Sequence, residues 1–257
     1  NNSDEQYSYI QAAKDKGYDV LIMDGQLDVH VVSQLEQKLE KTRFVRVDSD
    51  VADKLIEKEN VATVNLTDEQ RNAMVAVFES QLPKVDKTNF IVTFEQLSAS
   101  TNPVFVTQNE FMRRMKEMSA LQGGMMSFYG EMPDSFNLVV NTAHPVIEKL
   151  LKDEEAACLT EVAPLTSELS EVTAKHNALK DSHKDKKEEE IAVAEKEELS
   201  ALAKQMDELS EKKKAIYRSF AAENKQVRQL DDLALLANNM LKGEALANFV
   251  KRSVDMM

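Results

Sequence analysis

The chain has 257 residues and a mass of 29.0 kDa, which is long enough for one large domain or two modest ones. Its 45 acidic and 32 basic residues give a formal net charge of −13, so nucleic acid is a poor partner, because phosphate binding needs a basic surface. A lone cysteine excludes an intrachain disulfide, no apolar run reaches the roughly 18–20 residues of a membrane span, and 6 glycines with 5 prolines argue against a turn-rich all-β fold.

Residues 1–60 are predicted to form a small α/β unit. A helix over 4–16 is stopped by Gly17, and a second helix, which carries apolar residues at spacings of three and four over 31–39, lies between short apolar runs at 20–23 and 44–47. A strand, a helix and a strand in this order predict a parallel pair with a crossover helix, followed by a short helix over 50–57. Only Gly25 follows the first run, so we do not expect a nucleotide-binding loop.

Residues 65–151 are predicted to form a mixed α+β domain. Thr67 and Gln70 have the spacing of a capping box, which predicts a helix over 67–81. Strands are expected at 90–94, 104–106 and 138–140, and a helix over 109–121 interrupts them. His144-Pro145 is typical of a helix start, here predicted for 145–152.

Residues 152–224 have a different composition, with 18 acidic and 12 basic residues. Apolar residues alternate at spacings of three and four on each side of the charged stretch 181–190, as in a coiled coil. We therefore favour an antiparallel helical hairpin with its tip near 183–187. A continuous helix stays open as the alternative, because the tip has no glycine.

Residues 225–257 are predicted to form two apolar helices with a break at Lys242-Gly243. Such helices can pack on their own domain or on a second copy of the chain, and the pattern does not separate these two cases.

Catalytic motifs are lacking: the sequence has neither a nucleophile elbow nor a glycine-rich phosphate loop. Cys158 has apolar neighbours, which favours a small buried side chain over a nucleophile. His176 and His183 can share a helix face, but a solvated coiled-coil tip fits them better than a metal site. We expect neither catalysis nor a bound metal in this chain.

Methionines are concentrated between Met112 and Met132, where six of the twelve lie. On the predicted 109–121 helix they form an apolar stripe, and basic residues fill the opposite side. One interpretation is a core helix with flexible side chains; the other is an adaptable binding surface.

Several segments resemble the ninety-kilodalton heat-shock (Hsp90) chaperone family in its bacterial form. Residues 13–24 and 43–50 are similar to the end of that family's middle domain, and 103–151 to its C-terminal domain. The similarity is strongest in Asn109-Glu110-Phe111-Met112-Arg113-Arg114-Met115, in Asn141-Thr142-Ala143-His144-Pro145-Val146-Ile147 and in the ending 233–252.

This resemblance implies an ATP-dependent chaperone whose ATP and Mg site lies in an N-terminal domain upstream of this chain, so no ATPase activity is expected here. It implies a homodimer that contacts unfolded or partly folded client proteins. The family's client-contacting helix maps onto 109–121, and its dimer helices map onto 229–257. The implied client-binding residues are Phe111, Met112, Met115, Met118, Met125 and Met126. The implied interface residues are Leu230, Leu233, Ala237, Met240, Leu241, Leu246, Phe249, Val250 and Val254.

Two features depart from the family pattern. The 152–224 segment has no counterpart there; it can lengthen the dimer, contact a partner or simply be a solvated insertion, which we take as the default. The ending Val254-Asp255-Met256-Met257 lacks the acidic tail that eukaryotic co-chaperones bind, and the chain begins at Asn1, so we expect a piece of a bacterial cytoplasmic protein. The competing hypothesis is a structural coiled-coil module in which 165–220 carry the function.

Overall fold

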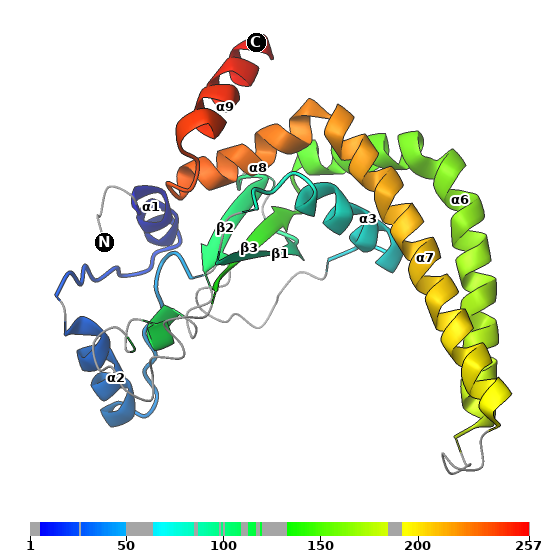
Figure 1. Ribbon diagram of the computed structural model, residues 1–257. Coiled ribbons are helices and arrows are strands. Elements are labelled where there is room, and N and C mark those ends of the chain that lie inside the picture. The colour runs from blue at the N-terminus through cyan, green and yellow to red at the C-terminus, as the bar shows by residue number, and fades with distance from the viewer. Residues whose placement is uncertain are drawn as a thin grey trace.

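The computed structural model describes residues 6–25, 27–49, 64–84, 87–97, 99, 101–108, 113–116, 119, 133–184 and 192–256. Helices and a small sheet alternate along the chain (Figure 1), which confirms the predicted α+β class with its long helical hairpin and two terminal helices. The elements are α1 (Tyr7–Asp15), α2 (Asp28–Lys38), α3 (Asp68–Glu79), β1 (Thr88–Glu95), β2 (Val104–Gln108), β3 (Asp134–Asn141), α6 (Pro145–Ser182), α7 (Val193–Glu223), α8 (Lys225–Ala237) and α9 (Gly243–Asp255).

A mixed three-stranded sheet forms the middle of the fold. β3 lies between the other two strands, parallel to β1 and antiparallel to β2. Phe90 and Phe136 are direct partners in this register, and their rings stack with centroids 5.8 Å apart. The three predicted strands are confirmed, each within a longer strand.

Helix α3 begins at the predicted capping box. The Thr67 hydroxyl accepts a hydrogen bond from the Gln70 backbone N–H, and the Gln70 side chain accepts one from the Thr67 N–H, both at 3.1 Å. One face of the helix is fully buried through Met74, Val77 and Phe78. This capped start therefore leads directly into the apolar core.

The two strands predicted in the N-terminal unit are not formed. The 20–23 and 44–47 runs have no regular secondary structure, and Leu21 and Ile22 are 68% and 73% exposed. A pair of four-residue strands with no further strand or covering layer buries too little surface to be stable. Two of the three predicted helices beside these runs form as α1 and α2, and the one predicted over 50–57 lies outside the described residues. α1 ends as predicted at Gly17, whose φ of +78° permits the hydrogen bond from the Tyr18 N–H back to the Ala13 carbonyl.

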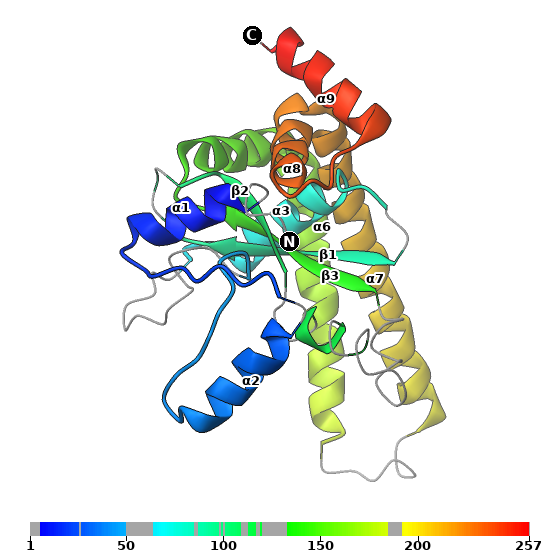
Figure 2. The ribbon, with the colours of Figure 1, turned by 90° about the vertical axis from the view of Figure 1, so that its left-hand side faces the viewer.

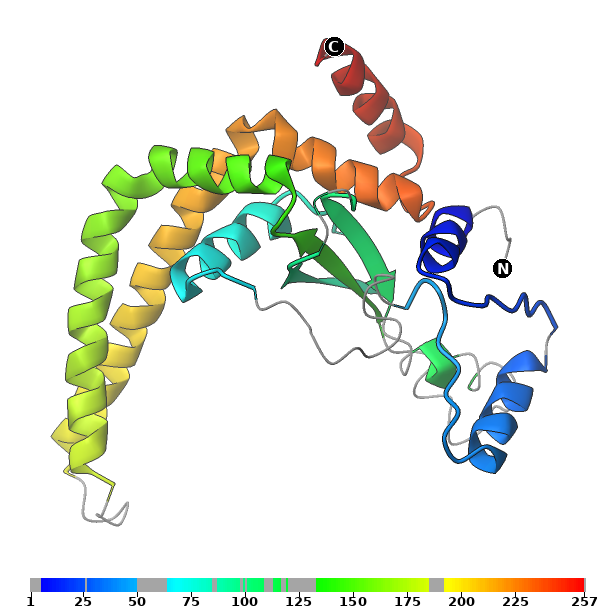
Figure 3. The same ribbon diagram turned by 180° about the vertical axis from the view of Figure 1, so that it is seen from behind.

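The predicted hairpin is confirmed, because α6 and α7 lie side by side and antiparallel (Figures 1 and 3). Close to its tip, the imidazole Nε2 of His183 lies 3.0 Å from a carboxylate oxygen of Glu195 on the other helix. The prediction that this helix ends at Lys152 is wrong, because α6 is continuous over 38 residues from Pro145 to Ser182. Pro164 lies inside it, and α6 changes direction along its length (Figure 1), as expected where a proline removes a backbone donor.

The base of the hairpin belongs to the main core rather than to an appendage. Cys158 and Val162 of α6, with Tyr217 and Ala221 of α7, join the same buried cluster as the sheet and α3. At the edge of this cluster the Glu69 carboxylate accepts hydrogen bonds from the Tyr217 hydroxyl at 2.9 Å and from the Lys213 ammonium at 2.5 Å. Burial alone would raise the pKa of Glu69. The hydrogen bonds and the charge of these partners outweigh that effect, so the pKa of Glu69 is lower than usual.

The terminal helices break where predicted. α8 ends at Ala237, and α9 starts at Gly243, whose φ is +57°. α8 lies along the sheet beside β2, whereas α9 points away from the body and carries the C-terminus (Figures 1 and 2). The outer parts of α6 and α7 and the whole of α2 lie on the side of the sheet opposite to α9 (Figures 1 and 3).

The buried Glu154 of α6 makes stability depend on pH. Its pKa is raised from 4.5 to about 7, first by burial and then by the charges of Glu155 and Glu69. Because the folded state holds this proton more tightly than the unfolded state, the stabilisation is complete below pH 4.5 and is lost as the pH rises through 7.

We therefore predict that Glu154→Gln raises the free energy of unfolding at pH 8 by about 1 kcal/mol and has little effect at pH 5. Urea unfolding followed by circular dichroism at both pH values measures this. Glu171→Gln, at an exposed position farther along α6, is the matched control and should leave the pH dependence unchanged. An equal pH dependence in the Glu154→Gln variant and the parent chain would contradict the prediction.

Candidate functional site

The methionine-rich segment is described at residues 113–116 and 119, and 113–116 are helical. Of the predicted client-binding residues, only Met115 falls within this part, and it is half-buried. The others lie outside the described residues: Phe111, Met112, Met118, Met125 and Met126. The geometry of this site is therefore defined by the polar neighbours of Met115.

The residues before and after Met115, Arg114 and Lys116, are basic, and both contact residues outside this helical turn. The Arg114 guanidinium lies 2.9 Å from a carboxylate oxygen of Glu36 in α2 and donates to the Phe44 carbonyl at 2.8 Å. The Lys116 ammonium lies 2.6 Å from the Asp134 carboxylate at the start of β3. The helical turn is thus joined both to the N-terminal unit and to the sheet.

Two carboxylates near this turn, those of Glu36 and Asp48, have lowered pKa values. Partial burial raises the pKa of Glu36, but the Phe44 N–H and the hydrogen bond and charge of Arg114 outweigh it, so the pKa is lowered. Burial likewise raises the pKa of Asp48, and the bidentate Arg46, the Gln6 amide and the charge of Arg113 together bring it below its usual range.

Helix α1 contacts the C-terminal domain through Tyr9. Its hydroxyl lies 2.8 Å from the Val106 carbonyl oxygen of β2 and 3.0 Å from the Asn238 side-chain oxygen at the end of α8. Burial raises the pKa of Tyr9 to about 12, so it remains a neutral donor. The N-terminal unit therefore contacts both the sheet and the terminal helices.

The predicted dimer residues divide into two groups. Leu230, Leu241 and Phe249 are buried in the core of the same chain, and Met240 and Leu246 are half-buried against it. The rest are exposed: Leu233 (48%), Ala237, Val250 (53%) and Val254 (64%). Exposed apolar side chains that nothing in the described chain covers therefore lie on both α8 and α9.

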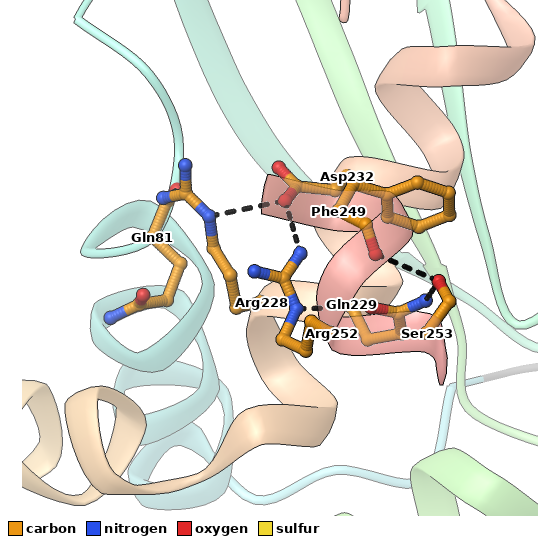
Figure 4. Close-up of polar contacts among 7 residues, drawn as sticks. All are labelled: Gln81, Arg228, Gln229, Asp232, Phe249, Arg252 and Ser253. Atoms are coloured by element: carbon orange, nitrogen blue, oxygen red, sulfur yellow. Dashed lines mark hydrogen bonds and ion pairs between the residues drawn. The ribbon is translucent and has the colours of Figure 1, made fainter. Parts of the chain in front are cut away.

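The position of α9 relative to α8 is set by Asp232. Figure 4 shows its carboxylate between two guanidinium groups: Arg252 of α9 lies 2.5 Å away, and Arg228 of α8 lies 3.3 Å away. Arg252 also donates to the Gln229 side chain at 3.0 Å, and the Gln229 amide donates to the Ser253 hydroxyl at 2.7 Å. Arg228 further donates to the Gln81 carbonyl after α3. A charged pair with several hydrogen bonds gives α9 a defined direction.

The neighbouring Asp231 is fully buried, and neither of its carboxyl oxygens has a hydrogen-bond partner within the described residues. Burial, and then the negative charge of Asp232, raise its pKa well above the usual value. Asp231 is therefore a neutral acid inside the fold, next in sequence to the carboxyl group that contacts Arg252 and Arg228.

The described residues contain no group of three or more His, Cys, Asp or Glu side chains that could hold a metal ion. In the same part of the chain, no helix has the length and apolar character to cross a bilayer. Cys158 is buried as predicted, and burial raises its pKa to about 11, which keeps the thiol protonated.

Sequence reasoning missed the contacts that position these surfaces. The basic side of the 109–121 helix was noted, but its partner Glu36 is 78 residues from Arg114. The approach of Arg252 to Asp232 depends on the angle between two helices, which apolar spacing does not encode. The charges themselves were the only available signal.

Comparison with known proteins assigns the chain to a family. The family model described as "Hsp90 protein" matches residues 1–169. The chain is 58% identical over its full length to "Chaperone protein HtpG" of Bacteroides thetaiotaomicron and 56% identical to that of Bacteroides fragilis, spanning 38% of each relative. It is 48% identical over 252 residues to "Chaperone protein HtpG" of Porphyromonas gingivalis, spanning 37% of that protein.

The match to the family model stops within α6, whereas the Bacteroides relatives align through the hairpin and both terminal helices. The sequence of the hairpin is therefore shared with these relatives, although the general family model ends at residue 169. With two thirds of its length matched by that model, the chain belongs to the Hsp90 family of chaperones.

Proposed function

We propose that this chain is the C-terminal part of an ATP-dependent molecular chaperone, and that it supplies homodimerisation and contact with unfolded or partly folded clients. The observation that carries the proposal is the full-length match to chaperones of which the chain spans 38%. The geometry of two surfaces supports these two roles.

The client surface is the methionine side of the 109–121 segment. In a helix meant only for the core, the apolar stripe contacts the fold and the charged side faces water. Here Arg114 and Lys116 contact carboxylates of the fold. That supports an outward role for the methionine stripe, whose flexible, polarizable side chains suit clients of many sequences.

The dimer surface is the exposed apolar part of α8 and α9, formed by Leu233, Ala237, Val250 and Val254. A second copy of the same two helices would cover it in a two-fold arrangement. The buried members of the predicted set, such as Leu230 and Phe249, would act indirectly, by holding α8 and α9 in position.

ATP and Mg are proposed for the part of the protein that precedes this chain. The N-terminal unit leaves Leu21, Ile22 and Leu27 exposed, which is consistent with further middle-domain structure packing there. We propose that the whole protein is a bacterial cytoplasmic chaperone whose nucleotide cycle opens and closes the dimer around a client. Nucleic acid and membranes are not proposed as partners.

The client surface can be tested in the full-length protein by changing Met112, Met115 and Met118 to Ser. We expect protection of an unfolding client from aggregation to fall by about threefold or more, because the apolar contact area is lost. Changing the same positions to Leu is the control and should preserve most of the protection. Unchanged protection in the Ser variant, measured by light scattering of the client, would remove this surface from the proposal.

The dimer surface can be tested with Val250→Asp and Val254→Asp together. Both side chains are exposed, so the fold of each chain should survive while two like charges disrupt the interface. Light scattering after size exclusion should give twice 29.0 kDa for the parent chain and 29.0 kDa for the variant. Val193→Asp, an exposed position on the hairpin, is the control and should remain a dimer.

The competing hypothesis of a coiled-coil module needs a deletion that spares the core. Removing 153–223 would disrupt the core, because this segment contains four core residues: Cys158, Val162, Tyr217 and Ala221. Replacing 173–205 by a short Gly-Ser linker removes only the outer hairpin and keeps the buried Val172 and Leu209. We expect the shortened chain to remain a dimer, whereas a monomer would favour the coiled-coil module.

A further inference from the structure

The helical turn at Met115 carries three basic side chains, Arg113, Arg114 and Lys116, and each interacts with an acidic residue elsewhere in the chain. Arg114 pairs with Glu36 of α2, and Lys116 pairs with Asp134 of β3. The charge of Arg113 helps to lower the pKa of Asp48, which lies at the end of the extended run after α2. Two of the three acids therefore belong to the N-terminal unit.

The Arg114 contact is more than a surface ion pair. Its side chain is 21% exposed, and its guanidinium reaches both the Glu36 carboxylate and the Phe44 carbonyl. The second Glu36 oxygen accepts the Phe44 N–H at 2.7 Å, so Glu36, Phe44 and Arg114 close a ring of hydrogen bonds. A planar donor with two fixed acceptors defines an orientation, which a single exposed contact does not.

On a helix, Arg114 and Lys116 project about 100° to either side of Met115, because successive residues are separated by that angle. Fixing these two side chains therefore fixes the direction in which the methionine side of the turn points. Since one anchor lies in α2 and the other at β3, this direction depends on how the N-terminal unit sits against the sheet.

We propose that Arg114 is a positioning residue for client binding, which couples the orientation of the methionine surface to the position of the N-terminal unit through Glu36 and Phe44. The inference rests on the proposed client surface. It adds that displacement of α2 relative to β3 changes client affinity by turning this surface, without any change in the methionines themselves.

The test uses the full-length dimer and a reduced, carboxymethylated protein that stays unfolded as the probe. We expect Arg114→Gln and Glu36→Gln each to weaken binding of this probe by about three- to fivefold, the scale of one partly buried charged contact. Amide hydrogen exchange at 113–116 should accelerate in both variants. Arg114→Lys, which keeps the charge but cannot reach two acceptors at once, should fall between the parent and Arg114→Gln.

The decisive comparison is the double variant that carries Arg114→Gln and Glu36→Gln together. Because both changes break the same ring of hydrogen bonds, a positioning pair predicts that the double variant loses little more affinity and exchange protection than either single variant. Lys149→Gln removes an exposed ion pair within α6 and should change neither readout.

Unchanged probe affinity in both Gln variants, or fully additive losses in the double variant, would overturn the inference. If the methionine-to-serine variant also binds the probe normally, the client surface itself is misassigned. If that variant loses binding while Arg114→Gln does not, only the positioning role fails.

Discussion

The C-terminal domain depends on contacts between α3 and the returning helix α7. One of them is the hydrogen bond from the Tyr217 hydroxyl to the Glu69 carboxylate, which joins residues 148 positions apart in the chain. A three-stranded sheet cannot bury its apolar face alone, and the helices that cover it come from both sides of the hairpin in the sequence. The chain therefore has to leave the domain along α6 and return along α7 before α8 can cover the sheet. The hydrogen bonds of Glu69 secure that return at the base of the hairpin.

Features that depend on a few neighbouring residues could be predicted from the sequence. The capping box at Thr67, the start at His144-Pro145 and the break before Gly243 all follow from backbone chemistry within one helical turn. The hairpin was predictable as well, because its two apolar seams repeat over many residues. The family resemblance had a similar source, since it rested on ordered local segments.

Features that depend on a distant partner could not be predicted in the same way. The run at 20–23 has the composition of a strand but finds no neighbouring strand in the described chain, so its side chains stay exposed. Leu230 and Val250 look alike in an apolar pattern, yet one is buried on the sheet and the other is open. The ring formed by Glu36, Phe44 and Arg114 requires the N-terminal unit to fold against the methionine-rich segment.

The bend of α6 gives the hairpin a mechanical property. From Pro164 to Ser182 the helix advances by 18 residue steps, or about 27 Å at 1.5 Å per step. A rotation of about 10° at its base would move the tip by about 5 Å, by lever geometry over that length. Because that base shares its core with α3 and the sheet, the outer hairpin would amplify any small rotation of the domain core. A fluorescent label near Val193 would convert such rearrangements into an optical signal.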